Sequence, residues 1–238
     1  MTKLSVNLNK VALIRNSRGH NMPDLMKVAI DCESYGAQGI TIHPRPDQRH
    51  AKYGDVALLK EVVTTELNIE GFPSDDFMKV VLTHKPDQVT LVPDEPGALT
   101  SDHGWDTVLR KNYLIEVIKR LQGEGIRTSI FVDADPRMIH GAKETGTDRV
   151  ELYTGPYAEN FDVDHDSAVN SYVEAAIEAN KSGIGLNAGH DLNLYNLRFF
   201  NTAVPGLLEV SIGHAIICDA LYFGLETTIK KYLELLAD

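Results

Sequence analysis

Eight short apolar or β-branched segments alternate with helical patterns along the 238 residues, and this repeat limits the possible folds more than any other feature. Each strand–helix unit takes roughly thirty residues, the size expected for a closed parallel barrel of about 250 residues. An open doubly wound sheet fits less well, because no Gly-x-Gly-x-x-Gly follows the first strand. We therefore predict one α/β domain over residues 1–238, a single (β/α)8 TIM barrel with extra short helices. The predicted strands are residues 5–8, 40–42, 68–71, 88–92, 128–132, 149–153, 185–188 and 208–212.

Helix start and stop signals divide the rest of the chain. Ser74 is typical of a helix cap, and Asp135 followed by Pro136 indicates an N-cap and a first helical residue. The segment after the first strand, which holds Arg15 and Arg18, is predicted to be a polar loop. Helices are predicted over residues 24–35, 55–67, 75–84, 112–123, 166–182, 194–202, 214–223 and 225–236, with another beginning at 136.

The charge distribution indicates what the protein binds. The formal net charge is −11, from 23 Lys and Arg against 34 Asp and Glu, which argues against nucleic acid or an anionic membrane as a bulk partner. Cations nevertheless gather near one predicted rim of the barrel. A local basic pocket in an acidic chain favours a small anionic ligand. These cations are Lys10, Arg15, Arg18, Arg45 and Arg49.

The cysteines and the apolar runs bear on location. Cys32 and Cys218 each lie inside a helical pattern, so we predict no disulfide framework and no Cys-x-x-Cys metal site. No signal peptide and no run of about eighteen apolar residues is recognisable. A cytoplasmic location is therefore expected.

The stretch over residues 39–50 is the first candidate for a functional site. A short β-branched strand ends here in His43, Arg45, Arg49 and His50. A buried strand that ends in cations and imidazoles is a common way for an α/β protein to present chemistry at one rim of its sheet. A solvated basic loop is the alternative, but four such residues within eight positions favour a site.

Polar residues also stand where the other strands end, and the carboxyl ends of barrel strands converge on one face. Glu70 in the third strand is the most informative, because a carboxylate inside a barrel needs a partner or a task. The alternative for Glu70 is a structural ion pair with a neighbouring Arg. Asp133 and Asp135 are more typical of a turn and a helix cap. The remaining candidates at this rim are Asn7, Asn9, Lys10, Thr100, Glu151, Asn187, Asp191 and Ser211.

Two Gly-His pairs close the seventh and eighth strands. Gly189-His190 and Gly213-His214 stand where barrels commonly bind phosphate through backbone N–H groups and a helix N-terminus. Together they predict a phosphate-binding site. His190 is then placed above the barrel mouth as a possible proton donor, although a histidine that is satisfied by a backbone partner is an equally good interpretation.

Other barrel chemistries fit less well. A Schiff-base aldolase needs a Lys inside the barrel, and none of the predicted strands carries one. A metal-dependent hydrolase usually shows two His one residue apart on the first strand, where this chain has Asn7 and Asn9. His43, Glu70 and His190 could still bind a divalent ion, so this class stays open.

The pattern as a whole resembles the pyridoxine 5′-phosphate synthase family. The similarity runs in order from the first strand through the helix after the eighth. The motifs that carry it are Val6-Asn7, Arg15-Asn-Ser-Arg18-Gly19, His43-Pro-Arg45, Asp47-Gln-Arg49-His50, Asn68-Ile-Glu70, Leu91-Val-Pro93, Phe131-Val-Asp-Ala-Asp135, Glu151, Thr154-Gly155, Tyr157-Ala158, Asn187-Ala-Gly-His190 and Ile212-Gly-His-Ala-Ile216. The resemblance implies a (β/α)8 barrel, a homo-octamer, and a reaction without metal or organic cofactor. That reaction joins 3-amino-2-oxopropyl phosphate to 1-deoxy-D-xylulose 5-phosphate and releases phosphate and water.

The resemblance also implies residue roles. His43 and Glu70 match the family's proton acceptors, His190 its proton donor, and Glu151 an acid that steadies charged intermediates. The positions that match those holding the amino-ketone phosphate are Asn7, Arg18, Asp191, Gly213 and His214. The positions that match those holding the deoxyxylulose phosphate are Asn9, Lys10, Arg45, His50 and Thr100.

This chain departs from the more familiar family pattern at two places. Asn9-Lys10 stands where that pattern has Asp-His, and Asp191 stands where it has Gly. Two other classes remain as alternatives: a metal-assisted hydrolase or lyase, and a non-catalytic barrel that binds a phosphorylated metabolite. The long loop over residues 93–106 carries the only Trp, Trp105, and is predicted to be a binding loop that orders over the mouth.

Overall fold

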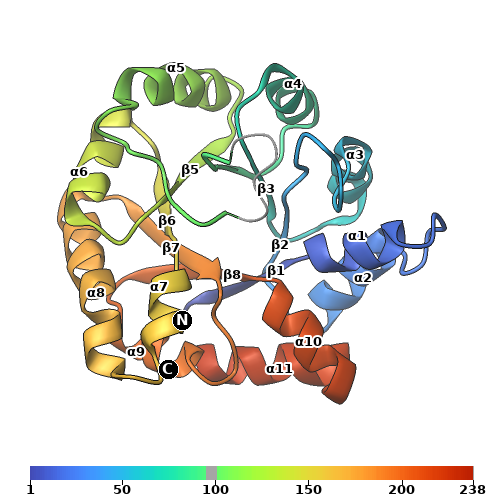
Figure 1. The fold of residues 1–238 in the computed structure, drawn as a ribbon. Coiled ribbons are helices and arrows are strands. Elements are labelled where there is room, and N and C mark those ends of the chain that lie inside the picture. The colour runs from blue at the N-terminus through green and yellow to red at the C-terminus, as the bar shows by residue number, and fades with distance from the viewer. Residues whose placement is uncertain (95–100, 238) are drawn as a thin grey trace.

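The computed structural model describes residues 1–94 and 101–237, and in it eight parallel strands close into a barrel in sequence order (Figure 1). Helices surround the barrel on its outside, so the predicted (β/α)8 architecture is confirmed. Each predicted strand overlaps an observed one, with ends displaced by up to two residues. The strands are β1 (Lys3–Asn7), β2 (Gly39–Ile42), β3 (Leu67–Gly71), β4 (Gln88–Leu91), β5 (Arg127–Val132), β6 (Arg149–Leu152), β7 (Gly185–His190) and β8 (Leu207–Ile212).

The helix caps agree with the sequence. The side chain of Ser74 accepts a hydrogen bond from the backbone N–H of Phe77 at 3.3 Å, and Asp135 accepts one from Arg137 at 2.8 Å. None of the helices in the described part of the chain is long and apolar enough to cross a membrane. The helices are α1 (Asn9–Asn16), α2 (Leu25–Ser34), α3 (Tyr53–Val62), α4 (Asp75–His84), α5 (Lys111–Gln122), α6 (Pro136–Thr145), α7 (Gly155–Asn160), α8 (His165–Ser182), α9 (Leu197–Ala203), α10 (His214–Phe223) and α11 (Leu225–Leu236).

The predicted polar loop after the first strand is wrong, because residues 9–16 form helix α1. Its buried face is Val11, Ala12 and Arg15, a helical spacing that includes a charged residue. The guanidinium of Arg15 makes two hydrogen bonds with the carboxylate of Asp55 on α3, at 2.7 and 2.9 Å. Arg15 is therefore a structural residue and does not contribute to a ligand-binding group of cations.

Replacing Arg15 by Met is expected to lower the free energy of unfolding by about 3–5 kcal/mol, because the Asp55 carboxylate would remain buried without its partner. Both side chains are less than a tenth exposed. Urea unfolding followed by circular dichroism measures the change. Arg137→Met is the matched control, since its pair with Asp135 lies at the surface, and it should leave the unfolding midpoint almost unchanged. Equal midpoints for both variants would contradict the structural role of Arg15.

The interior of the barrel is filled largely by polar side chains. A hydrogen-bonded belt runs from the hydroxyl of Ser5 through Thr41 and Asn68 to Thr90, with distances of 2.8, 3.3 and 3.1 Å. Since these side chains point inward, the alternate apolar residues of the strands point outward to the helices and form the core there. The polar belt is the platform beneath the barrel mouth.

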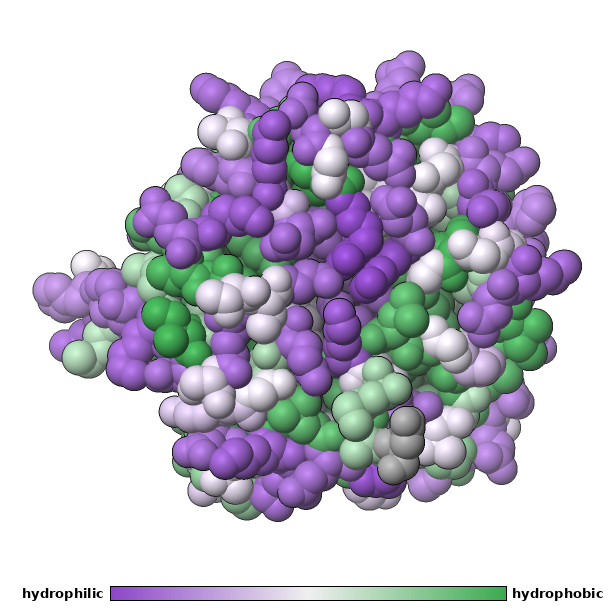
Figure 2. Space-filling model, turned by 180° about the vertical axis from the view of Figure 1, so that it is seen from behind, coloured by the Kyte–Doolittle hydropathy of each residue, from purple (hydrophilic) through white to green (hydrophobic). Residues whose placement is uncertain are grey.

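A second polar layer closes the amino-terminal end of the barrel. Arg127 pairs with Glu66, and Arg149 lies 3.5 Å from Glu209. Figure 2 views the molecule from this side and shows hydrophilic side chains gathered over the middle of the face. The pKa of Glu209 is raised to about 7 by burial and by the charge of Glu66, against the opposing effect of the arginines. These charges balance one another far from the strand ends where the candidate residues lie.

The segment after β4 is anchored by Trp105. Its indole is buried and stacks on Phe72 with ring centroids 5.9 Å apart, and its backbone N–H donates to the carbonyl of Phe131 at 2.9 Å. Trp105 therefore packs against residues at the ends of β3 and β5, and residues 95–99 of the predicted binding loop lie outside the described residues. Thr100 lies outside the described residues.

Candidate active site

Three strands bring Asn7, His43 and Glu70 together at the barrel mouth. The amide of Asn7 donates to the Glu70 carboxylate at 3.4 Å, and Nδ1 of His43 is 4.0 Å from the same oxygen. The backbone N–H of His43 donates to the side chain of Asn9 at 2.8 Å, which ties the start of α1 to the end of β2. The structure therefore brings together four of the predicted site residues, Asn7, Asn9, His43 and Glu70.

Glu70 and Glu151 are buried carboxylates that influence each other. Burial raises the pKa of Glu70 to about 7, with a further increase from Asp94 and decreases from His190 and Asn7. Burial and the charge of Glu70 raise the pKa of Glu151 well above its usual value. Two carboxylates in one dry site do not both ionise easily. The pKa of Glu151 is thus raised by its burial beside Glu70, and Glu70 titrates near pH 7.

The predicted alternative for Glu70 was an ion pair with a neighbouring Arg. Within residues 1–94 and 101–237, the ion-pair contact of Glu70 is to His43 and not to an arginine. A carboxylate whose pKa lies near 7 and that faces two imidazoles is suited to accept a proton.

The two catalytic candidates among the histidines have opposite environments. Burial lowers the pKa of His43 well below its usual value, and the charges of Arg45, His50 and His190 lower it further. His190 lies on the other side of the mouth, with Nδ1 2.8 Å from the carboxylate of Asp191. Burial lowers the pKa of His190, but Asp191 and Glu70 raise it to a value above the usual one. His43 is therefore neutral at pH 7, and His190 is the better proton donor.

A group of cations lines the mouth beside β2. The buried guanidinium of Arg45 is held by Asp94 at 2.7 Å. Burial and the charges of Arg45, Arg49 and Lys10 lower the pKa of His50 to about 4. His50 is thus a neutral donor at pH 7 among three cations, which is a suitable lining for an anionic group.

The glycines of the two Gly-His pairs are needed for close packing of the backbone, in addition to the phosphate binding predicted for the pairs. A Cβ on Gly189 would lie 2.2 Å from the carbonyl oxygen of Ser211, so only glycine lets β7 and β8 approach here. A Cβ on Gly213 would lie 2.9 Å from the backbone oxygen of Asn7. Gly213 precedes α10, and His214 is the exposed first residue of that helix. The N-terminus of α10 therefore opens at the barrel mouth, where backbone N–H groups can receive a phosphate.

Arg18 is the predicted residue that the structure does not bring to this group. It follows α1 at its outer end and is exposed, and Figure 1 shows the α1–α2 connection projecting at the edge of the molecule. The predicted pairing of Arg18 with Gly213 and His214 is thus not made within one chain.

Two residues of the mouth were not singled out in the sequence. The ring of Tyr153 meets His190 edge-on with centroids 6.0 Å apart, and Asp94 holds Arg45. Strand periodicity contained a signal for Tyr153, which lies two residues after Glu151 and so on the same face. Asp94 follows the end of β4 and carried no comparable signal.

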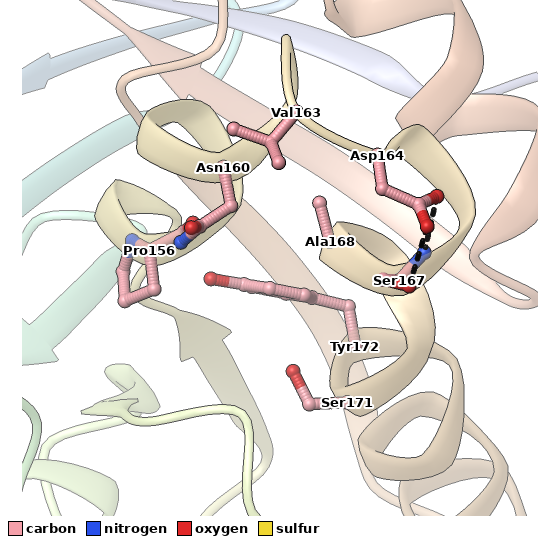
Figure 3. Close-up of a pocket in the computed structure, with 8 residues that line it drawn as sticks. All are labelled: Pro156, Asn160, Val163, Asp164, Ser167, Ala168, Ser171 and Tyr172. Atoms are coloured by element: carbon pink, nitrogen blue, oxygen red, sulfur yellow. Dashed lines mark hydrogen bonds between the residues drawn. The ribbon is translucent and has the colours of Figure 1, made fainter.

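Two surface cavities lie beside this site. One of about 360 Å³ opens between α7 and α8, lined by Val163, Ala168 and Tyr172 among others (Figure 3). The second, of about 300 Å³, is bordered by Asp133, Tyr153 and Tyr172. The predicted site residues line neither cavity. Within the described ranges, no group of three or more His, Cys, Asp or Glu side chains is arranged to hold a metal ion.

Comparison with solved structures finds the same barrel fold in other proteins. Phosphoribosyl anthranilate isomerase from Thermotoga maritima superposes with a TM-score of 0.63 at 14% identity, covering 99% of this chain and 98% of that one. Thiamine phosphate pyrophosphorylase from Pyrococcus furiosus gives a TM-score of 0.64 at 15% identity, covering 98% and 95%. At these identities the likeness concerns the fold alone.

Sequence comparison is far more specific. The pyridoxine 5′-phosphate synthase of Flavobacterium johnsoniae is 58% identical over 234 residues, 98% of this chain and 99% of the relative. That of Porphyromonas gingivalis is 54% identical over 237 residues and the full length of both chains. A family model described as pyridoxal phosphate biosynthesis protein PdxJ matches residues 4–238. The chain, with its carboxylates and imidazoles at the mouth of a (β/α)8 barrel, belongs to the PdxJ family of pyridoxal phosphate biosynthesis proteins.

Proposed function

We propose that this chain is a pyridoxine 5′-phosphate synthase. It condenses 3-amino-2-oxopropyl phosphate with 1-deoxy-D-xylulose 5-phosphate and releases pyridoxine 5′-phosphate, inorganic phosphate and water. The observation that carries the proposal is Glu70, a buried carboxylate with a pKa of about 7 that faces His43 at 4.0 Å. The full-length similarity to synthases of that name supports the choice of substrates.

The groups at the mouth suit a reaction with several proton transfers. His43 and Glu70 act as bases during condensation and ring closure, because one is neutral and the other ionises near pH 7. His190 acts as the acid that protonates a departing oxygen. Glu151, whose pKa is raised by burial and by the charge of Glu70, stabilises charge that develops on the intermediate.

Two phosphate-binding sites follow from the same arrangement. Gly213 and His214 at the start of α10, with Asn7, are assigned to the amino-ketone phosphate. The cations and donors beside β2 are assigned to the deoxyxylulose phosphate; these are Asn9, Lys10, Arg45 and His50, with Thr100 added from the family resemblance. Arg18 and Asp191 were also expected at the first site. Arg18 is exposed beyond α1, and the carboxylate of Asp191 is 2.8 Å from Nδ1 of His190.

Incubation of the purified protein with both phosphates tests the proposal directly. Formation of pyridoxine 5′-phosphate, followed by its absorbance and confirmed by mass spectrometry, is the expected result. Binding of both phosphates without product would favour a non-catalytic binding barrel. Activity that requires an added divalent metal would favour a metal-assisted hydrolase or lyase.

Arg45→Lys is expected to weaken binding of the deoxyxylulose phosphate by about 1–3 kcal/mol, because lysine does not reproduce the bidentate grip of a guanidinium on phosphate. Asp94 holds Arg45 in place at 2.7 Å, so the guanidinium is already oriented. Isothermal titration of each substrate separately measures the effect. Binding of the amino-ketone phosphate should hardly change, and equal weakening of both would contradict two separate phosphate-binding sites.

We also propose that the chain works as a homo-oligomer, an octamer by family resemblance, in the cytoplasm. Exposed apolar side chains on two adjacent helices support self-association: Leu13 and Ile14 on α1, and Leu221, Tyr222 and Phe223 on α10. Both cysteines are unpaired, which fits a reducing compartment. Light scattering coupled to size-exclusion chromatography gives the number of chains.

A further inference from the structure

Asp191 lies beside the imidazole that the proposed function uses as its acid. One of its carboxylate oxygens is 2.8 Å from Nδ1 of His190. Its backbone N–H already donates to the carbonyl of Gly189 at 3.1 Å, and its carboxylate has the same sign of charge as a phosphate. These facts disfavour the role of phosphate ligand that the family resemblance implies for this position.

The turn that carries His190 holds both residues in place. His190 has a φ of +70°, and the hydrogen bond from Asp191 to Gly189 spans it, which makes a γ-turn of the rarer, strained kind. The carbonyl of Asp191 accepts hydrogen bonds from the side chains of Asn193 and Asn196, at 3.4 and 3.3 Å. Asp191 is therefore fixed through its backbone on both sides, with its carboxylate at the ring.

Charged groups reach His190 from several elements. The carboxylates of Asp191 and of Glu70 on β3 favour the imidazolium, whereas burial and the ammonium of Lys10 on α1 disfavour it. His43 at the end of β2 repels a charged His190 only when His43 is itself protonated, which its lowered pKa disfavours. Tyr153 after β6 contacts the ring edge without charge. Asp191 is the carboxylate of this group that hydrogen-bonds to Nδ1 of the ring.

We propose that Asp191 is a positioning residue that orients His190 through Nδ1 and keeps the imidazole in its proton-donating form beside Lys10. The inference rests on the proposed function, because it takes His190 as the acid. An Nδ1–H bound to a carboxylate fixes the ring and stabilises the imidazolium. The proton then leaves from Nε2. The departing oxygen takes the electron pair of its C–O bond together with this proton, and a solvent proton later restores the imidazolium.

The test compares Asp191→Asn, which keeps the shape and removes the charge, with Asp191→Glu, which keeps the charge. Asp102→Asn is the matched control, because Asp102 likewise contacts the ring of the next residue, His103, at 2.7 Å but on the surface. Two quantities are measured: the titration of His190 by NMR of protein carrying ¹³Cε1-labelled histidine, and the pH dependence of kcat. The His190 resonance is identified by its loss in His190→Gln.

Asp191→Asn is expected to lower the titration midpoint of His190 by about one pH unit or more, the usual effect of a neighbouring opposite charge. The alkaline limb of the kcat profile should move by the same amount, Asp191→Glu should restore both, and Asp102→Asn should move neither. An unchanged His190 titration in Asp191→Asn would overturn the proposal. A shifted titration with an unchanged kcat profile would instead show that His190 is paired but is not the acid, which would refute its role in the proposed function. The NMR measurement also stands if no product is formed at all.

Discussion

Glu70→Gln is expected to lower kcat by about a hundredfold to ten-thousandfold, the range for loss of a general base. The substitution keeps the size of the side chain and the hydrogen bond from Asn7, and it removes only the ability to accept a proton. The dissociation constants of both substrates should change far less, because binding rests on the two phosphates. Steady-state kinetics and separate titration of each substrate measure the two effects.

The pH profile makes this test sharper. Glu70 acts as a base only when ionised, and burial sets its pKa at about 7. The value of kcat should therefore fall as the pH decreases below 7, and this acid limb should disappear in Glu70→Gln. Glu226→Gln, which alters an exposed pair with Lys230, should retain both the rate and the limb. Near-parental turnover of Glu70→Gln would make Glu70 a structural residue and the proposed mechanism wrong.

The fold could be predicted from the sequence because its signals are local. The short apolar or β-branched segments of the strands and the caps at Ser74 and Asp135 depend on neighbouring residues, and both appear in the structure. The errors in the predicted helices arose where a contact with a residue distant in sequence determines the local structure. Residues 9–16 form a helix because Arg15 on its inner face pairs with Asp55, forty residues away, and the predicted helix 55–67 ends at Val62. There Glu33 of α2 accepts the backbone N–H groups of Thr64 and Thr65 in an extended segment.

The site could be predicted as a set of residues, since parallel strands present their carboxyl ends on one face. Its electrostatics could not. The raised pKa of Glu151 follows from its burial next to Glu70, and the raised pKa of His190 follows from Asp191 and Glu70. In the sequence these residues lie far apart, and nothing there shows how deeply each side chain is buried. We also counted Arg15 and Arg18 among the ligand-binding cations. In the structure Arg15 forms a buried ion pair with Asp55, and Arg18 is exposed beyond the end of α1.

His43→Gln should likewise lower kcat by about a hundredfold to ten-thousandfold, but it should leave the acid limb near pH 7 in place. Burial and four neighbouring charged or titratable side chains lower the pKa of His43 well below its usual value, so the imidazole is neutral in the range in which Glu70 titrates. The acid limb therefore belongs to Glu70. Loss of His43 lowers kcat at every pH but leaves the fall of kcat below pH 7 in place.

The two substitutions together separate the two bases. The backbone of His43 is held by Asn9 at 2.8 Å, and glutamine can keep that contact, so a change in turnover reports on the imidazole itself. His140→Gln, at an exposed histidine on α6, is the control and should leave kcat unaltered. If the acid limb disappeared in His43→Gln and persisted in Glu70→Gln, the ionisation near pH 7 would belong to the imidazole. The assignment of Glu70 as the base that ionises near pH 7 would then be wrong.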